Sequence, residues 1–158
     1  MTRIRSYVAA DAPHLSALYR RSVLEVGSRD YGPAQIQAWA ALAPSPERLQ
    51  IQSEDGRIRL VASDALDLPV AFADLEPDGH IDLFYCAPEA AGTGIAAALY
   101  EALESSARQQ GMTRLYAEAS ERARPFFLKQ GFAVIAKREF EVTGVPIHNY
   151  AVEKSLAL

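Results

Sequence analysis

The residues whose types and spacing best predict chemistry are Gly92 and Gly94, which stand between a strand pattern and a helix pattern. Residues 81–86 form a mostly apolar run, and an amphipathic helix stripe begins at Ile95. The start of a helix offers unpaired N–H groups and the positive end of its dipole, and both attract phosphate. Glycine lets the backbone approach such a ligand closely. The segment therefore predicts a site for a phosphorylated cofactor.

The same glycines also satisfy a dinucleotide-binding pattern, G-x-G-x-x-A over residues 92–97, with Glu118 roughly where a ribose-binding acid is expected. Two features disfavour that interpretation. Residues 87–91 separate the strand from the glycines, and only one strand–helix–strand unit is predicted. The Lys-Ser or Lys-Thr of a nucleotide-binding P-loop does not follow the glycines. A nicotinamide-dependent oxidoreductase and a glycine turn without a ligand stay open as alternatives.

Composition limits the remaining function classes. A chain of 158 residues fits a single domain over 1–158, and a net charge of -4 argues against a nucleic-acid partner. The single cysteine, Cys86, excludes an internal disulfide, and His14, His80 and His148 lack metal-ligand spacing. We see no signal peptide and no membrane-spanning run. We expect a cytoplasmic protein with no metal, membrane or nucleic-acid partner.

The elements that position these residues follow from periodicity and from turn residues. We expect strands at 2–8, 57–63, 68–75, 80–86, 114–119, 133–141 and 145–153. We expect one helix capped by Asp11 and ended by Gly27, and a second that starts at Pro33 and is broken by Pro44 and Pro46. Two more are expected from Ile95 to Gly111 and over 122–130. This order predicts a mixed α/β or α+β sheet instead of a regular doubly wound one.

Several blocks of the second half resemble the GCN5-related N-acetyltransferase (GNAT) family. The blocks are LFYCAPE at 83–89, AGTGIA at 91–96, SERA at 120–123 and FFLKQGF at 126–132. The resemblance covers nearly the whole chain, and residues 31–40 resemble a small bacterial subgroup. It implies a central, mostly antiparallel sheet of six to seven strands with one parallel, splayed pair, flanked by about four helices.

The resemblance implies acetyl-CoA as co-substrate. The family's pyrophosphate loop maps onto residues 91–96, where Gly94 and Ala96 match but Ala91 replaces the usual Gln or Arg. The backbone of residues 84–86 should pair with the pantetheine arm. The cofactor-binding residues implied in this way are Phe84, Tyr85, Cys86, Ala91, Gly92, Thr93, Gly94, Ile95, Ala96, Ser120, Ala123 and Phe127.

Acetyl transfer to an amine needs a group that takes the amine proton, and a carboxylate or a water that it orders can do so. By resemblance, Asp82 stands where some histone-type relatives carry a general-base glutamate, and Glu118 lies on the neighbouring strand. Either carboxylate can serve as base or bind a cationic substrate, or be a charge with only a salt-bridge partner. We interpret Cys86 as a small buried thiol and not as a nucleophile, because no partnered histidine is evident.

Phe127 stands where many relatives have a tyrosine that protonates the departing thiolate, and phenylalanine has no proton to give. Tyr85, Tyr150 and Tyr31 are candidate substitutes, as is water. Tyr31 and Trp39 lie in the N-terminal helices, which in this family roof the acceptor site, so we expect both to bind substrate; Trp39 can equally be a core residue.

The resulting hypothesis is an N-acetyltransferase that moves an acetyl group from acetyl-CoA to a primary amine of a small molecule or protein, by direct transfer in a ternary complex. We expect a monomer or a homodimer. The departures at Ala91 and Phe127 leave open an alternative, a non-catalytic acyl-CoA-binding sensor or interaction module on the same fold.

Overall fold

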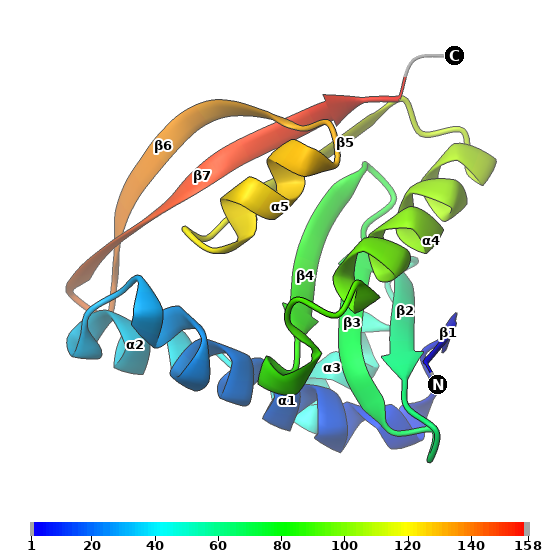
Figure 1. Cartoon of the computed structure of the whole chain (residues 1–158), viewed down its shortest axis with the longest axis horizontal. Coiled ribbons are helices and arrows are strands. Elements are labelled where there is room, and N and C mark those ends of the chain that lie inside the picture. The colour runs from blue at the N-terminus through cyan, green and yellow to red at the C-terminus, as the bar shows by residue number, and fades with distance from the viewer. Residues whose placement is uncertain (1, 157–158) are drawn as a thin grey trace.

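A computed structural model describes residues 2–156 and arranges them around one seven-stranded sheet of order β1-β2-β3-β4-β5-β7-β6 (Figure 1). Neighbouring strands are antiparallel except β4 and β5, which are parallel. The strands are β1 (Arg3–Ser6), β2 (Ile58–Ser63), β3 (Pro69–Leu75), β4 (His80–Cys86), β5 (Arg114–Ala119), β6 (Ala133–Val142) and β7 (Val145–Ser155). The expected mixed, mostly antiparallel sheet is confirmed.

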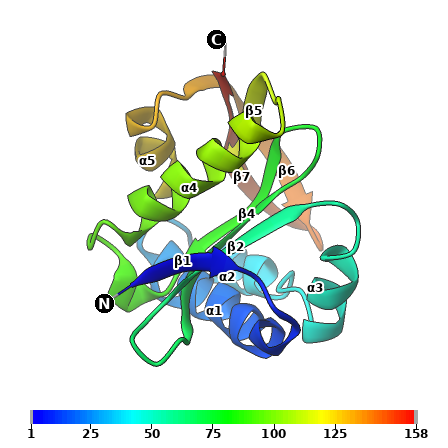
Figure 2. The ribbon, with the colours of Figure 1, turned by 90° about the vertical axis from the view of Figure 1, so that its right-hand side faces the viewer.

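Helices cover both faces of this sheet. The α-helices are α1 (Ala12–Glu25), α2 (Pro33–Ala40), α3 (Pro46–Gln52), α4 (Ile95–Gln109) and α5 (Ala123–Lys129). Short 3₁₀ turns lie at η1 (Ala9–Asp11), η2 (Gly27–Arg29) and η3 (Pro88–Ala90). Helices α4 and α5 lie on one face, and α1, α2 and α3 lie on the other (Figures 1 and 2).

Residues 2–156 contain five α-helices, whereas about four were expected. The missed helix is α3. Pro46 does not break a helix but starts one, because at the first helical position its absent N–H costs nothing and its fixed φ suits the helix. Ser45 caps this helix by accepting the N–H of Arg48 at 3.1 Å.

Asp11 precedes α1 as expected, but its carboxylate does not cap that helix. It accepts two hydrogen bonds from the Arg5 guanidinium at 2.8 and 2.9 Å and one from the Val8 N–H at 2.9 Å. The carboxylate therefore ties β1 to the turn that leads into α1.

The core divides according to the alternation of β3. Ala71, Ala73 and Leu75 belong to the cluster beneath α4, whereas Phe72 belongs to the cluster with α1. All four are fully buried, because a central strand covered on both faces has no solvent side.

The feature that matters most for a site is the separation of β4 from β5 (Figure 1). The two strands pair only at His80 with Tyr116 and at Ile81 with Ala117. Beyond this point β4 remains paired with β3 as far as Cys86, and β5 remains paired with β7 as far as Ala119. Each strand follows its own outer neighbour, so the sheet opens between them and the expected splayed pair is confirmed.

Candidate active site

A cavity of about 450 Å³ occupies the opening between β4 and β5. Its walls include Asp82, Phe84, Tyr85 and Cys86 of β4, Glu118 of β5, Tyr19 and Ser22 of α1, Trp39 of α2, Ala123, Phe126 and Phe127 of α5, and Arg138 and Phe140 of β6. Ala96, in the first turn of α4, also lines it. The cavity therefore connects the start of α4 with the region enclosed by α1, α2 and the β6–β7 hairpin.

The glycine loop at the start of α4 has the geometry of an anion site. Gly92 and Gly94 have φ of +74° and +87°, and no heavy atom lies within 4 Å of a Cβ placed on either. Gly94 caps α4 without a side-chain hydrogen bond, and the first turn carries no acidic residue. Thr93 closes the loop by donating its hydroxyl to the Ala90 carbonyl. The first N–H groups of α4 have no intrahelical acceptor, so the loop fits a pyrophosphate.

An aromatic cluster forms part of the cavity wall. Phe84 lies 5.4 Å from Phe126 and 6.1 Å from Phe127 between ring centroids, and Phe127 packs edge-on against Phe132 at 4.9 Å.

Burial raises the pKa of the Cys86 thiol to about 11, so this thiol is protonated at neutral pH and is a poor nucleophile.

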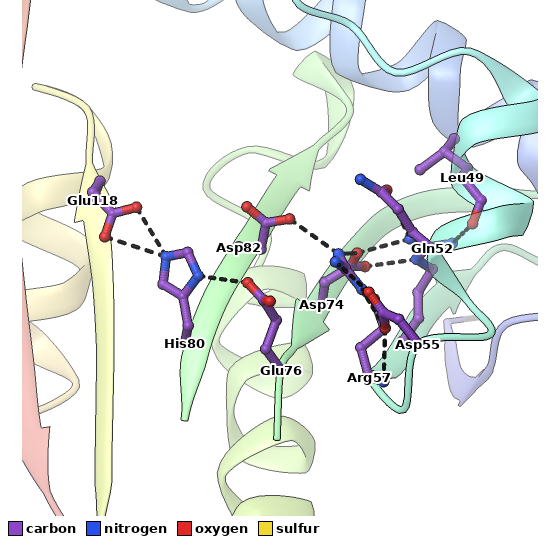
Figure 3. A network of polar contacts seen from close by, with 10 residues as sticks. Leu49, Gln52, Asp55, Arg57, Asp74, Glu76, His80, Asp82 and Glu118 are labelled. Carbon is purple, nitrogen blue, oxygen red and sulfur yellow. Dashed lines mark hydrogen bonds and ion pairs between the residues drawn. The ribbon is translucent and has the colours of Figure 1, made fainter. Parts of the chain in front are cut away.

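Asp82 is held from one side by a network of arginines and aspartates (Figure 3). The Arg57 guanidinium lies 3.0 Å from Asp82 Oδ2, 2.7 Å from Asp74 and 2.9 Å from Asp55. Asp74 is fully buried and also pairs with Arg59 at 2.7 and 2.8 Å. Because buried charges need partners, the deeper pairs fix Arg57, and Arg57 in turn fixes the carboxylate that faces the cavity.

Glu118 is held by an imidazole (Figure 3). Nε2 of His80 lies 2.9 and 3.2 Å from the two oxygens of Glu118, and Nδ1 lies 2.6 Å from Glu76. The hydrogen bond to Glu118, with help from Glu76 and against the effect of burial, raises the pKa of His80 from 6.5 to about 9. The same bond lowers the pKa of Glu118. At neutral pH the network is an imidazolium between two carboxylates.

Within the described part of the chain, Glu76, His80 and Asp82 are side chains of metal-binding type whose ligand atoms all lie within 4.8 Å of one another. Both ring nitrogens of His80 already contact carboxylates, and Asp82 already pairs with Arg57. These atoms are therefore engaged with protein partners, and we read the group as an ion-pair network.

The end of the cavity beneath α1 and α2 is mostly aromatic. The Tyr31 hydroxyl donates to the His148 carbonyl at 3.1 Å and accepts the Glu121 N–H at 3.0 Å, and its ring packs edge-on against Trp39 at 5.5 Å. The ring of Tyr19, which was not among the predicted site residues, lies 4.4 Å from that of Tyr85. Both tyrosines line the cavity.

The expected proton donors to the thiolate differ in their surroundings. Burial raises the pKa of Tyr85 well above its usual value. The Tyr150 hydroxyl donates to Glu121 at 2.6 Å, and Tyr31 is engaged as described above. Phe127, only 3% exposed, is packed among other phenylalanines. Phe127, at the position where many relatives have a tyrosine, is therefore part of an apolar wall.

The structure brings most of the sequence-predicted site residues to this one cavity. Those that line it are Asp82, Glu118, Tyr31, Trp39, Phe84, Tyr85, Cys86, Ala96, Ser120, Ala123 and Phe127. Ala91, Gly92, Thr93, Gly94 and Ile95 lie in the loop and first helical turn that precede Ala96. Arg57 and His80, which hold the two carboxylates, were not predicted as site residues. No sequence signal marks these two contacts, because Arg57 and Asp82 lie 25 residues apart and His80 and Glu118 lie 38 residues apart.

Comparisons with known proteins find acetyltransferases. The acetyltransferase (GNAT) domain family matches residues 28–154. An uncharacterized N-acetyltransferase of Escherichia coli K12, YafP, is 28% identical over 148 residues, which are 94% of this chain and 92% of that protein.

Solved acetyltransferase structures share the fold of this chain. A GCN5-related N-acetyltransferase from Rhodopseudomonas palustris is 30% identical, with a TM-score of 0.88 over 99% of this chain and 96% of that one. The PaiA N-acetyltransferase of Thermoplasma acidophilum, solved with coenzyme A, shares the fold at 20% identity, with a TM-score of 0.77 over 98% of this chain and 99% of that one. Within residues 2–156, none of the helices has the length and apolar character needed to cross a membrane.

Proposed function

This chain belongs to the GNAT acetyltransferase family, and from that premise we propose that it transfers the acetyl group of acetyl-CoA to a primary amine of a small molecule or protein. The observation that carries the proposal is the opening between β4 and β5. It has a phosphate-accepting helix start at one end and two carboxylates, Asp82 and Glu118, on its walls.

The residues present fit acetyl-CoA. The N–H groups at the start of α4, beside Gly92 and Gly94, would hold the pyrophosphate without a side chain from Ala91. Residues 84–86 use one edge of β4 to pair with β3, and their other edge faces the opening, where the amides of the pantetheine arm would add like a strand. Phe84, Phe126 and Phe127 supply an apolar wall for that arm.

We assign different roles to the two carboxylates. The pKa of Glu118 is lowered by its bond to His80, so Glu118 keeps its charge and is suited to binding the amine. Asp82 takes the amine proton as the nitrogen attacks the acetyl carbonyl, and its short side chain favours transfer through a water. The new C–N bond forms as the C–S bond breaks, and the proton that Asp82 takes from the amine would return through water to the departing thiolate of coenzyme A, since Phe127 has none to donate.

Two measurements test this function. The first compares thermal unfolding with acetyl-CoA and with NAD, because a ligand that binds only the folded state stabilises it, by about 2.7 kcal/mol at 100 times its Kd. The second follows release of the coenzyme A thiol over a panel of amines. We expect a shift with acetyl-CoA alone and release that depends on the amine.

Two other outcomes would change the proposed cofactor or the proposed activity. A shift with NAD alone would replace the assigned cofactor. Tight acetyl-CoA binding without release of coenzyme A over broad amine and protein panels would favour a non-catalytic acyl-CoA-binding module. The departures from the family pattern at Ala91 and Phe127 are the reason to consider that module.

A further inference from the structure

His80 does not itself line the cavity. Its Nε2 contacts both carboxylate oxygens of Glu118, which does line the cavity. We propose that His80 is a positioning residue for the acceptor amine: as an imidazolium clamped between Glu76 and Glu118, it holds the Glu118 carboxylate ionised and fixed at the cavity wall. This inference rests on the proposed function and adds to it a residue that sets how acceptor binding depends on pH.

The geometry of the clamp favours a charged ring. Nδ1 faces Glu76 at 2.6 Å, and Nε2 faces the two oxygens of Glu118 at 2.9 and 3.2 Å. An ionised carboxylate only accepts hydrogen bonds, so both ring nitrogens must donate, and only the doubly protonated imidazole can do that. The ring is also stacked on Tyr116, with centroids 4.8 Å apart and planes inclined by 23°, which restricts its rotation.

The two cavity carboxylates differ in the kind of cation that holds them. Arg57 holds Asp82 and keeps its charge at any pH at which the protein is folded. His80 holds Glu118 and can lose its proton. Loss of the His80 proton therefore changes the contact that holds Glu118, whereas Arg57 continues to hold Asp82.

The charged groups around the imidazole favour its protonated form. Glu76 faces it from the turn that follows β3, and Glu118 faces it from β5. Asp82 lies on its own strand with a carboxylate oxygen within 4.8 Å of the ligand atoms of Glu76 and His80. Asp78 accepts the hydroxyl of the stacked Tyr116. Cations also act on these groups: Arg57 pairs with Asp82 at 3.0 Å, Arg138 acts through its charge on Glu118, and the Arg114 guanidinium lies 4.4 Å from the centre of the Tyr116 ring.

Loss of the proton has a definite consequence. The neutral ring donates from one nitrogen only, so one carboxylate loses its hydrogen bond, and Glu118 loses the neighbouring positive charge in either case. A loosened Glu118 binds the acceptor less well. The acceptor KM is therefore expected to rise as pH passes through about 9, the value to which the pKa of His80 is raised. The KM for acetyl-CoA, which binds along β4 and at the start of α4, should not follow it.

The experiment compares steady-state kinetics from pH 7 to pH 10 for the unaltered protein, His80→Gln and the matched control His14→Gln. His14 is an exposed histidine on α1 outside the cavity. Glutamine can donate to Glu118 but carries no charge and does not titrate. We expect His80→Gln to raise the acceptor KM about tenfold at pH 7, the cost of weakening one charged hydrogen bond, and to abolish its rise near pH 9.

A second variant keeps the ring and tests the clamp itself. Glu76→Gln leaves both His80 and Glu118 in place but removes one of the carboxylates that keep the ring charged. The midpoint of the rise in KM should therefore move to lower pH. The titration of the His80 ring, followed by NMR, should move by the same amount, which a purely structural contact would not produce.

The outcomes separate the two proposals. An unchanged acceptor KM and pH profile in both variants, with normal turnover of the unaltered protein, would overturn the role of His80 and leave the transferase function standing. No release of coenzyme A from the unaltered protein with any amine would overturn the function, and the role of His80 with it. A parallel rise in the KM for acetyl-CoA would show a general distortion of the cavity and would also overturn the positioning role.

Discussion

Asp82 and Glu118 hold the next positions in register after the last pair formed between β4 and β5. His80 pairs with Tyr116 and Ile81 with Ala117, and the strands separate from there on. The two carboxylates therefore stand on opposite sides of the opening where it begins. Each has its own cation, Arg57 for Asp82 and His80 for Glu118. From this relationship and from the glycine loop we draw four predictions.

Asp82→Asn should lower kcat about 10²- to 10⁴-fold, since the amide cannot take the amine proton and general-base catalysis contributes that much. The matched control is Asp64→Asn. Asp64 accepts the N–H groups of Leu66 and Leu68 in the β2–β3 turn, and an asparagine carbonyl can do the same. Coenzyme A release is measured, together with the thermal shift by acetyl-CoA, which both variants should retain. A full rate for Asp82→Asn would remove Asp82 from the mechanism.

Gly94→Val should abolish the thermal shift by acetyl-CoA. The residue has φ of +87°, and valine at that position is strained and occupies the space where the pyrophosphate is expected. Gly111→Val is the control, because Gly111 follows the other end of α4 with φ of +77° and equally open surroundings. Both variants should lose similar stability, but only Gly94→Val should lose the response to acetyl-CoA. Retention of that response would place the pyrophosphate elsewhere.

Arg59→Met should lower the free energy of unfolding by about 3 kcal/mol, because it removes one partner of a buried ion pair. Arg59 and Asp74 are 2% and 0% exposed at their side chains, and only Arg57 would then remain for Asp74. Arg3→Met, at a pair whose side chains are 66% and 58% exposed, should change the free energy by less than about 1 kcal/mol. Urea denaturation of both variants checks the contrast, and equal losses would contradict it.

The His80 network should make stability depend on pH. Folding raises the pKa of His80 from 6.5 to about 9, so the folded state holds this proton more tightly than the unfolded state does. The stabilisation is present in full below pH 6.5 and is lost as the pH rises through about 9. The difference in free energy of unfolding between the unaltered protein and His80→Gln should therefore shrink between pH 6 and pH 10. A difference that is constant or grows over this range would contradict the raised pKa.

Local patterns in the sequence determined most of the elements. Strands β4 and β5 begin and end where apolar alternation and turn residues predicted, at His80–Cys86 and Arg114–Ala119. The glycine loop was recognised because a pair of glycines and a following helix stripe are local features. The missed helix α3 shows the limit, since Pro46 can break a helix or start one, and only the surrounding contacts decide which.

The sequence by itself also identified Asp82 and Glu118 as the acidic candidates, but only the tertiary structure decided what holds them. Arg57 meets Asp82 across 25 residues of sequence, and His80 meets Glu118 across 38. Such pairs depend on strand order and register, which bring side chains together without any signature in the intervening sequence. The opening between β4 and β5 has the same origin, because each strand follows its outer neighbour in the sheet.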